Sequence, residues 1–323
     1  MRILTLACLI LLFTSPHALA QRPIRPLLPL HTWTLPDYVA VPFTEALHLP
    51  DDLEAASYAG VAMTPQNTLI VLSRDPQPFL EFTADGRFLR GFGAENLLAR
   101  AHGLHIDTDG HLWVTDVNDH VVLKLDADGQ VLLTIGTKGQ AGEWDEAAGQ
   151  HLLSEPNDVA LDSAGNIYVA QGHGGQLPRV LKFSPAGEFL AQWGSRGYGP
   201  GQFVAAHAIE IDANDVLHVA DRENMRIQRF DTQGALLREW RFDAMVCALY
   251  LHDDGYLYIT TGFDGELARV DMDGNVLGSI GSPGTGNGQF GEAHALTLDA
   301  AGNAWIADVI NRRVQKFAKL PPR

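Results

Sequence analysis

The feature that most limits how this chain can fold is an internal repeat. Each copy has a short apolar strand, a turn, a second strand that ends near an aspartate, another turn and a third strand. The clear copies span residues 102–125, 157–183, 207–230 and 294–317, and two weaker copies span residues 60–82 and 247–270. Six strand-forming units at a regular period are typical of repeat architectures such as propellers.

Strand and turn chemistry within each copy supports this interpretation. Second strands such as 112–114 (Leu-Trp-Val) and 167–169 (Ile-Tyr-Val) are β-branched and aromatic. Asp109-Gly110 separates the first two strands of one copy, and a second dipeptide, Asp128-Gly129, leads into a fourth strand. The segments VADRENMRIQRF and IADVINRRVQKF resemble NHL repeats. The chain is therefore predicted to be all-β, a six-bladed β-propeller with NHL-type repeats.

The last blade needs a strand from elsewhere, because only six residues follow Phe317. The strand-like stretch 31–35 belongs to no other copy, so we expect it to complete this blade and to avoid an unpaired sheet edge. The expected organisation is a signal peptide over residues 1–20, a Pro-rich linker over residues 21–30 and a propeller over residues 31–323.

The N-terminus has the pattern of an export signal. A basic residue, Arg2, precedes an apolar run over residues 3–13, and Ala18-Leu19-Ala20 supplies the small residues of a cleavage site before Gln21. The apolar run is too short for a permanent membrane span. We expect a secreted or periplasmic product with no membrane anchor after signal removal.

Charge and cysteine content exclude several classes of protein. The net charge is −16, and no cluster of lysine and arginine is present. This argues against nucleic acids and anionic membrane surfaces as partners, and it leaves a small molecule or a peptide as the expected partner. Signal removal leaves Cys247 as the single cysteine, so an intramolecular disulfide is not expected.

Two glycine-rich stretches, 194–203 and 281–290, are not phosphate-binding loops. They lack the strand before, the helix after and the Gly-Lys-Ser/Thr ending that such a loop needs. Since they recur at the same place in two copies, we expect them to connect blades, with Phe203 and Phe290 as buried plugs.

Histidines recur at one position of alternate repeats. Alignment of the copies places one residue per blade at the start of the innermost strand, in the order Ala59, His102, Asn157, His207, Cys247 and His294. Imidazoles from blades two, four and six would converge on the propeller axis. Three histidines with an open fourth position are the ligand set of catalytic Zn²⁺.

Two questions stay open at this position of the repeat. The three histidines could instead be ordinary polar channel residues, and Cys247 is either a fourth ligand, which would make the site structural, or a small channel residue. Histidines outside this pattern, such as His105, are expected in solvent.

Longer segments resemble one family of enzymes. HGLHIDTDGHLWVTDV, PNDVALDSAGNIYV, AGEFLAQWG, PGQF and VADRENMRIQ are similar to segments of the peptidyl-α-hydroxyglycine α-amidating lyases, and the likeness runs from about Arg74 to Phe317. The resemblance implies a six-bladed propeller whose axial zinc is held by His102, His207 and His294. It also implies release of glyoxylate from a C-terminal α-hydroxyglycine, which leaves a peptide amide.

The resemblance also assigns roles at the active site, with some departures. Arg74 and Arg222 match two active-site arginines of the family, although each could instead form a surface or inter-blade ion pair. The catalytic tyrosine position is nearest His173, and an imidazole can act as a base near neutral pH. The family's methionine is Glu292, and its calcium carboxylate is Ala295, so Ca²⁺ stays open only as a weakly supported second ion.

The expected function is therefore a zinc-dependent carbon–nitrogen lyase acting on an α-hydroxyglycine-type carbinolamide. His173, or a hydroxide held by the metal, would take the hydroxyl proton, while Arg74 and Arg222 would hold the glyoxylate carboxylate. The alternative is a non-catalytic secreted propeller that serves as a binding platform. A calcium-dependent lactonase is a weaker alternative, because its axial ligands would be Glu, Asn and Asp.

Overall fold

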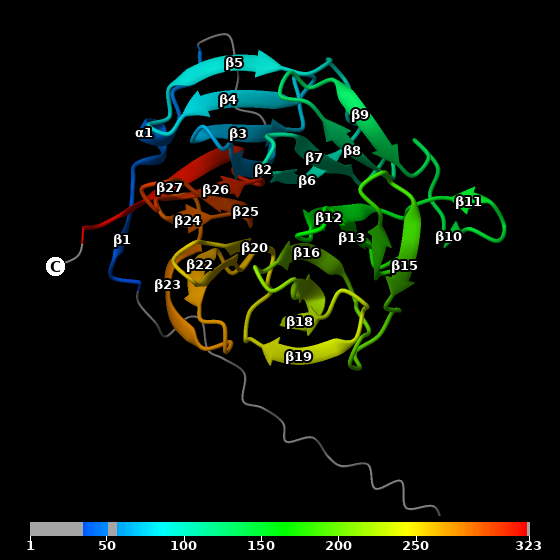
Figure 1. Cartoon of the computed structure of the whole chain (residues 1–323). Coiled ribbons are helices and arrows are strands. Elements are labelled where there is room, and N and C mark those ends of the chain that lie inside the picture. The colour runs from blue at the N-terminus through cyan, green and yellow to red at the C-terminus, as the bar shows by residue number, and fades with distance from the viewer. Residues whose placement is uncertain (1–34, 51–56, 322–323) are drawn as a thin grey trace, which may run out of the picture.

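Antiparallel hairpins make up nearly all of the computed structural model, which describes residues 35–50 and 57–321. The hairpins form six sheets arranged as blades around a central axis (Figure 1). The predicted six-bladed all-β propeller is therefore confirmed. The predicted signal peptide and linker lie outside the described residues.

Each blade is a sheet whose first strand lines the axis. Blade one is β2 (Tyr58–Met63), β3 (Thr68–Ser73), β4 (Phe79–Thr83) and β5 (Phe88–Phe92), and blade two is β6 (Ala101–Ile106), β7 (Leu112–Asp116), β8 (Val121–Leu125) and β9 (Val131–Ile135). Blade three is β12 (Pro156–Leu161), β13 (Ile167–Gln171), β14 (Arg179–Phe183) and β15 (Phe189–Trp193). Blade four is β16 (Ala206–Ile211), β17 (Leu217–Asp221), β18 (Arg226–Phe230) and β19 (Leu236–Arg241).

The last two blades carry small additions. Blade five is β20 (Ala248–Leu251), β21 (Leu257–Thr260), β22 (Glu266–Val270) and β23 (Val276–Pro283), with β24 (Gln289–Phe290) pairing parallel to β23. Blade six is β25 (Ala293–Leu298), β26 (Ala304–Asp308), β27 (Arg313–Lys319) and β1 (Tyr38–Ala40). Outside the blades lie α1 (Phe43–Ala46), the 3₁₀ turn η1 (Arg222–Asn224) and a hairpin of β10 (Trp144–Asp145) and β11 (Gln150–His151).

Aspartates at the ends of the inner strands set the first hairpin turns. Asp107 Oδ1 accepts hydrogen bonds from the amides of Asp109 and His111, at 3.0 and 2.9 Å. Asp162 and Asp299 hold the same turn in blades three and six. These side-chain contacts add to the backbone hydrogen bonds of the same turns, so a repeated aspartate favours a repeated hairpin.

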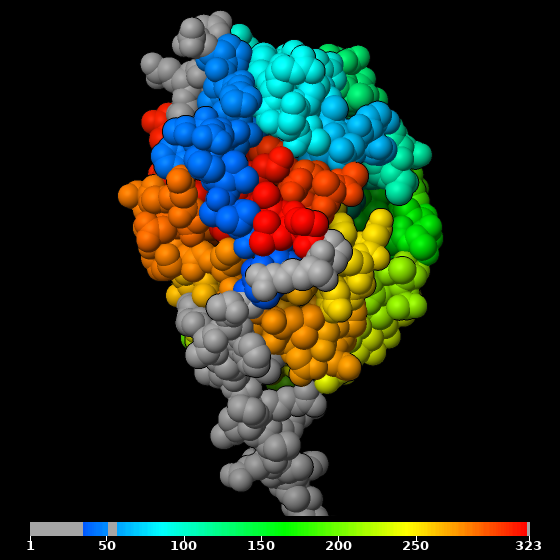
Figure 2. Space-filling view, turned by 90° about the vertical axis from the view of Figure 1, so that its left-hand side faces the viewer, coloured from blue at the N-terminus to red at the C-terminus, as the bar shows by residue number. Residues whose placement is uncertain are grey.

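An N-terminal strand completes blade six. β1 pairs antiparallel with β27, with Val39 opposite Ala318. Figure 2 shows this segment, in blue, lying against the red C-terminal strands. The pairing begins three residues beyond the stretch 31–35 that we expected to supply the strand; Leu35 lies outside any strand, and residues 31–34 lie outside the described residues. The buried phenol of Tyr38 donates to the Gly302 carbonyl at 2.9 Å and so ties the two chain ends together.

The core lies between neighbouring blades. Phe203 and Phe290, at the ends of the two glycine-rich stretches, are both 0% exposed and contact separate apolar clusters. The predicted plugs are therefore present, and the glycine-rich stretches join β15 to β16 and β23 to β25. Among the described residues, no helix is long and apolar enough to cross a membrane.

Candidate metal centre

A β-bulge shapes the start of the inner strands that carry the aligned residues. The register between first and second strands shifts around His207, from Ala206 to Ala208, and around His294, from Ala293 to Ala295. In blade two the shift lies between Ala101 and Leu104 and so contains His102. A bulge leaves a residue out of the ladder and re-aims its side chain. The histidines leave the alternation of the strand and face one another across the axis.

Each of the three histidines is held by the backbone of the next blade. The Nδ1 atoms of His102, His207 and His294 lie 2.8, 2.7 and 2.7 Å from backbone carbonyl oxygens. Those carbonyls belong to Asn157, Cys247 and Ala59, the aligned residues of the alternate blades. A carbonyl only accepts, so Nδ1 carries the proton and donates it, which leaves a lone pair on each Nε2. A metal-binding histidine is commonly oriented through its other nitrogen in this way.

The Nε2 atoms have the arrangement of a metal donor set. His102 Nε2 and His294 Nε2 lie 3.3 Å apart, and the Nε2 of His207 is buried without a hydrogen-bond partner in the described chain. Two nitrogens bound to one tetrahedral Zn²⁺ at about 2.0–2.1 Å would lie about 3.3 Å from each other. Lone pairs at such a distance repel unless a cation lies between them. The residues therefore fit Zn²⁺ bound by these histidines.

Burial keeps these imidazoles neutral. It lowers the pKa of His102 and of His207 well below the ordinary value, with neighbouring histidines and Arg222 adding to the effect. Burial, followed by the charge of Arg74, lowers the pKa of His294 to about 3. Neutral imidazole is the form that binds a metal, so protons do not compete for the site near pH 7.

His173 lies at the same centre. It follows β13, and its ring centroid is 4.7 Å from that of His102 and 5.7 Å from that of His207. Ligand atoms of these three residues all lie within 4.8 Å of one another. Burial, followed by Arg222, Arg100 and Arg74, lowers the pKa of His173 to about 4. His173 is thus a neutral imidazole beside His102 and His207.

Both predicted arginines lie at the same end of the channel, which we call the mouth. Each follows the second strand of its blade, as His173 does. Arg74 Nε donates to the Ala101 carbonyl at 3.0 Å, next to His102, and Arg222 lowers the pKa of both His173 and His207. Arg222 Nε also donates to Glu223 at 2.8 Å, a contact between neighbouring residues of the same blade.

Two further charged residues lie at the mouth: Arg100, which the sequence did not single out, and Glu292, which it identified only as the replacement of the family's methionine. Arg100 lowers the pKa of His173 and of Arg74, which places its charge among them. Glu292 Oε1 is 3.9 Å from Arg222 Nη1, and burial raises the pKa of its carboxyl against the opposing effect of the arginines. Each residue lies two positions before one of the three axial histidines, which we call the ring histidines. This regular spacing is the signal that could have revealed Arg100 and Glu292.

An aspartate clamp supports the residues that precede each histidine. Asp116 accepts hydrogen bonds from the amide of Arg100 at 3.1 and 2.9 Å. Asp221 and Asp308 make the equivalent contacts in blades four and six, to residues 204–205 and 291–292. Each aspartate ends the second strand of a histidine-bearing blade, so the clamp recurs in the same blades as the imidazoles.

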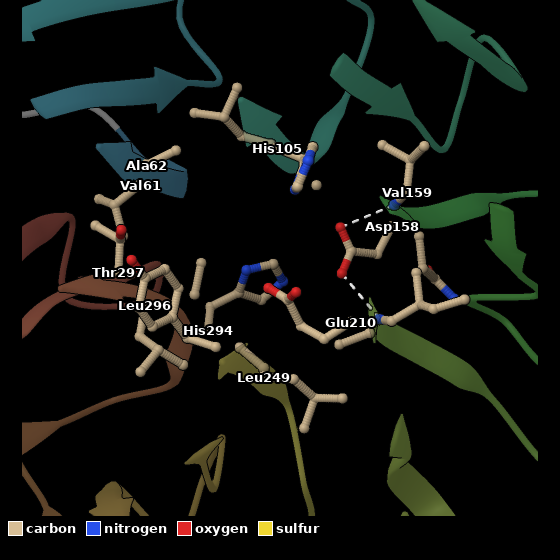
Figure 3. Close-up of a pocket in the computed structure, with 18 of the residues that line it drawn as sticks. Val61, Ala62, His105, Asp158, Val159, Glu210, Leu249, His294, Leu296 and Thr297 are labelled. Carbon is tan, nitrogen blue, oxygen red and sulfur yellow. Dashed lines mark hydrogen bonds between the residues drawn. The ribbon is translucent and has the colours of Figure 1, made fainter. Parts of the chain in front are cut away.

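Beyond the histidines the channel opens into a cavity of about 270 Å³. The carboxylates of Asp158 and Glu210 point into it, and His105 and His294 also line it (Figure 3). Burial raises the pKa of Asp158 to about 7 and lowers that of His105 to about 4. His105 was expected in solvent; it is half-buried and lines this cavity rather than the outer surface.

Cys247 is a buried channel residue rather than part of the histidine donor set. Its Sγ lies 3.9 Å from His207 Nδ1, on the side of the ring that faces the carbonyl rather than the axis. Burial raises its pKa to about 12, which keeps it protonated. The small-residue alternative for Cys247 fits this geometry.

Comparison with known proteins gives a consistent set of relatives. A family model described as a 6-bladed beta-propeller matches residues 150–277. Peptidyl-glycine alpha-amidating monooxygenase B of Xenopus laevis is 30% identical over 322 residues, which are 84% of this chain and 36% of that protein. A probable peptidyl-alpha-hydroxyglycine alpha-amidating lyase of Caenorhabditis elegans is 36% identical over 167 residues, or 50% of this chain and 43% of that one. The chain thus spans less than half the length of these relatives.

Other similarities extend over the whole propeller. NHL repeat-containing protein 3 of Homo sapiens is 28% identical over 282 residues, which cover 80% of this chain and 79% of that protein. A gluconolactonase structure from Xanthomonas campestris superimposes with a TM-score of 0.63 at 19% identity, covering 93% of this chain and 99% of that chain. A streptogramin B lyase structure gives a TM-score of 0.60 at 14% identity, with coverages of 87% and 97%. At such identities these two structures share the fold alone.

Proposed function

The chain belongs to the NHL-type six-bladed propellers related to the peptidyl-α-hydroxyglycine α-amidating lyases, and on this premise we propose that it is a zinc-dependent lyase. Its substrate would be an α-hydroxyglycine-type carbinolamide, on a peptide or a small molecule. The observation that carries the proposal is the convergence of three Nε2 atoms at the axis, beneath two arginines at the mouth.

The reaction requires few groups. The hydroxyl loses a proton, the bond between the α-carbon and the amide nitrogen breaks, a carbonyl forms on that carbon, and the nitrogen gains a proton. The products are an amide and glyoxylate, so atoms and charge balance without a redox partner. Zn²⁺ held by His102, His207 and His294 would supply Lewis acidity toward oxygen.

Residues at the mouth would perform the remaining tasks. The guanidinium groups of Arg74 and Arg222 would bind the substrate carboxylate, which suits their planar donor forks. Two groups are placed to accept the hydroxyl proton. His173 is neutral because its pKa is lowered to about 4, and burial raises the pKa of the Glu292 carboxyl, which makes that carboxylate a better proton acceptor.

A binding platform is the second candidate function. Human NHL repeat-containing protein 3 matches over most of both chains, and His173 and Glu292 replace the tyrosine and methionine of the lyase pattern. A platform would keep the propeller and the metal and would have no turnover.

Glyoxylate release from α-hydroxyhippurate separates the two functions. The zinc-loaded full chain should release glyoxylate and benzamide in equal amounts, and a chelator should abolish the release. Arg222→Lys should lower kcat/KM by about 100-fold because the bidentate contact is lost, whereas Arg87→Lys should not. If the folded, zinc-loaded protein releases no glyoxylate from this substrate or from a hydroxyglycine-extended peptide, the lyase proposal fails and the platform is favoured.

A further inference from the structure

His173 adds a fourth imidazole to the three-histidine ring, and we propose that it is a fourth protein ligand of the metal. The inference rests on the metal-binding part of the proposed function and is independent of the reaction. It makes the resting centre a four-histidine site, in which His173 occupies the position that a substrate would otherwise take. Substrate binding at the metal would then require His173 to leave.

The first support is the position of the ring. Ligand atoms of His173, His102 and His207 lie within 4.8 Å of one another, and His173 contacts the His102 ring edge-on at 76°. His102 Nε2 in turn lies 3.3 Å from His294 Nε2. His173 therefore lies beside two of the three axial histidines, and the third, His294, contacts His102.

The second support is the loop that presents His173. It lies in the segment Gly172-His173-Gly174-Gly175, in which Gly172 and Gly175 have φ values of 101° and 75° that favour glycine. Glu155 holds this segment on both sides of the histidine. Its carbonyl accepts from the Gly172 amide at 2.9 Å, and its carboxylate accepts from the Gly174 amide at 2.7 Å.

A second residue holds the end of this loop. Arg196 Nη1 donates to the Gly175 carbonyl at 2.7 Å. The backbone around His173 is therefore fixed at three points while its side chain projects from a glycine-flanked position. The backbone hydrogen bonds fix where the Cα of His173 lies, while its side chain can still rotate. A loop of this kind can present an imidazole to a metal held by the neighbouring histidines.

The third support is the chemistry of the ring nitrogens. Within the described chain, no hydrogen bond occupies a ring nitrogen of His173. Other histidines differ, because His120 Nδ1 accepts from the Glu155 amide at 3.1 Å and His218 Nε2 contacts Asp212 at 3.2 Å. Half-buried and without such a partner, the His173 imidazole has a lone pair available for a metal.

Cobalt binding to the full chain tests the proposal. Co²⁺ stands in for Zn²⁺, its dissociation constant is measured by chelator competition, and its visible absorption reports the ligand set. His173→Phe should weaken binding by about 10- to 100-fold and change the absorption band. Thiocyanate should shift the band of this variant, because a coordination position is open, and should shift wild-type protein much less. His48→Phe, which alters an exposed histidine, is the matched control and should behave as wild type.

Rescue separates loss of a ligand from loss of structure. The variant His173→Gly should bind Co²⁺ weakly, and added imidazole should restore the wild-type absorption band.

The proposal is overturned if His173→Phe and wild type have equal dissociation constants and equal thiocyanate responses, a result that would leave the three-histidine site intact. If folded wild-type protein binds neither Co²⁺ nor Zn²⁺, this proposal and the metal site both fail. A third outcome is possible: His173→Phe binds Co²⁺ more weakly, and wild-type protein releases no glyoxylate. This result would support His173 as a ligand and overturn only the proposal that the protein is a lyase.

Discussion

Two kinds of ionisable side chain face the central channel, and their pKa shifts act on stability in opposite directions. The ring histidines have lowered pKa values, so the unfolded chain binds more protons than the fold and acid destabilises it. Asp158 and Glu210 have raised values, because burial disfavours their charged forms. The fold binds their protons more tightly than the unfolded chain does, so rising pH removes stability through these two groups.

Glu210 permits a test of this argument at one residue. Its carboxyl has an ordinary pKa of 4.5, and burial followed by the charge of Asp158 raises the value well above that in the fold. Above pH 4.5 folding must therefore keep a carboxyl protonated that would ionise in the unfolded chain. Glu210→Gln removes this cost, so its stability relative to wild type should grow with pH by up to about 1.4 kcal/mol per unit. Urea unfolding of metal-free protein at pH 5 and pH 8 measures the difference.

The control is Glu188→Gln, which alters an exposed carboxylate in a surface turn and should show no such trend. A stability difference for Glu210→Gln that is the same at pH 5 and pH 8 would contradict a raised pKa.

The bulges explain why some residues were predictable and others were not. The ring histidines were predicted because they occupy one position of a repeat, and that argument needs no knowledge of local geometry. His105 lies three residues after His102, and simple strand alternation would place the two side chains on opposite faces. The bulge between Ala101 and Leu104 breaks this alternation, and both side chains reach the channel. A bulge has no sequence signature clear enough to have shown this.

At the scale of strands and turns, the aspartate clamp joins the end of each second strand to the segment that leads into a histidine. Asp116 accepts from the amides of Arg100, Asn118 and Asp119, and it is fully buried. An amide side chain at this position would turn an NH₂ group toward at least one of these donors. The segment that begins β6 would then shift, and His102 with it.

Asp116→Asn should therefore weaken metal binding by about 10- to 100-fold, as loss of outer-sphere support commonly does. Asp126→Asn is a matched control, because Asp126 caps a turn between β8 and β9 through similar amide contacts and is remote from the ring. It should lower stability without changing metal affinity. Chelator competition on both variants measures the affinities, and an equal loss in the two would show that the clamp acts only on general stability.

The sequence predicted the strands of the repeats more accurately than the closing strand. Strands within the repeats were identifiable because apolar alternation and Asp-Gly turns mark both ends. The closing strand β1 is only three residues long and has no such marks. Its place is set by pairing with β27, a contact between the two ends of the chain that local sequence does not encode.

At the scale of the whole molecule, the metal site connects every blade of the ring. Blades two, four and six supply the ring histidines, and blades one, three and five supply the carbonyls that orient them. An unfolded chain cannot bring these groups together, so metal binding should stabilise the entire propeller. A free metal concentration of 100 times Kd corresponds to about 2.7 kcal/mol of added stability.

The pH dependence of this zinc stabilisation tests whether the ring histidines are shielded from solvent. Since the pKa values of His173 and His294 are about 4 and about 3 in the metal-free fold, protons should not compete with metal until the pH approaches 4. The increase in unfolding free energy on adding Zn²⁺ should therefore be the same at pH 7.5 and pH 5.5.

The metal-free protein should behave differently over the same interval. It should lose stability as the pH falls below about 6.5, because the ring histidines gain protons in the unfolded chain and do not in the fold. Urea unfolding with Zn²⁺ and with chelator at both pH values measures these quantities, and His207→Ala should show a much smaller zinc effect at both. A zinc effect that disappears between pH 7.5 and pH 5.5 would mean that the imidazoles titrate normally and that the ring is open to solvent.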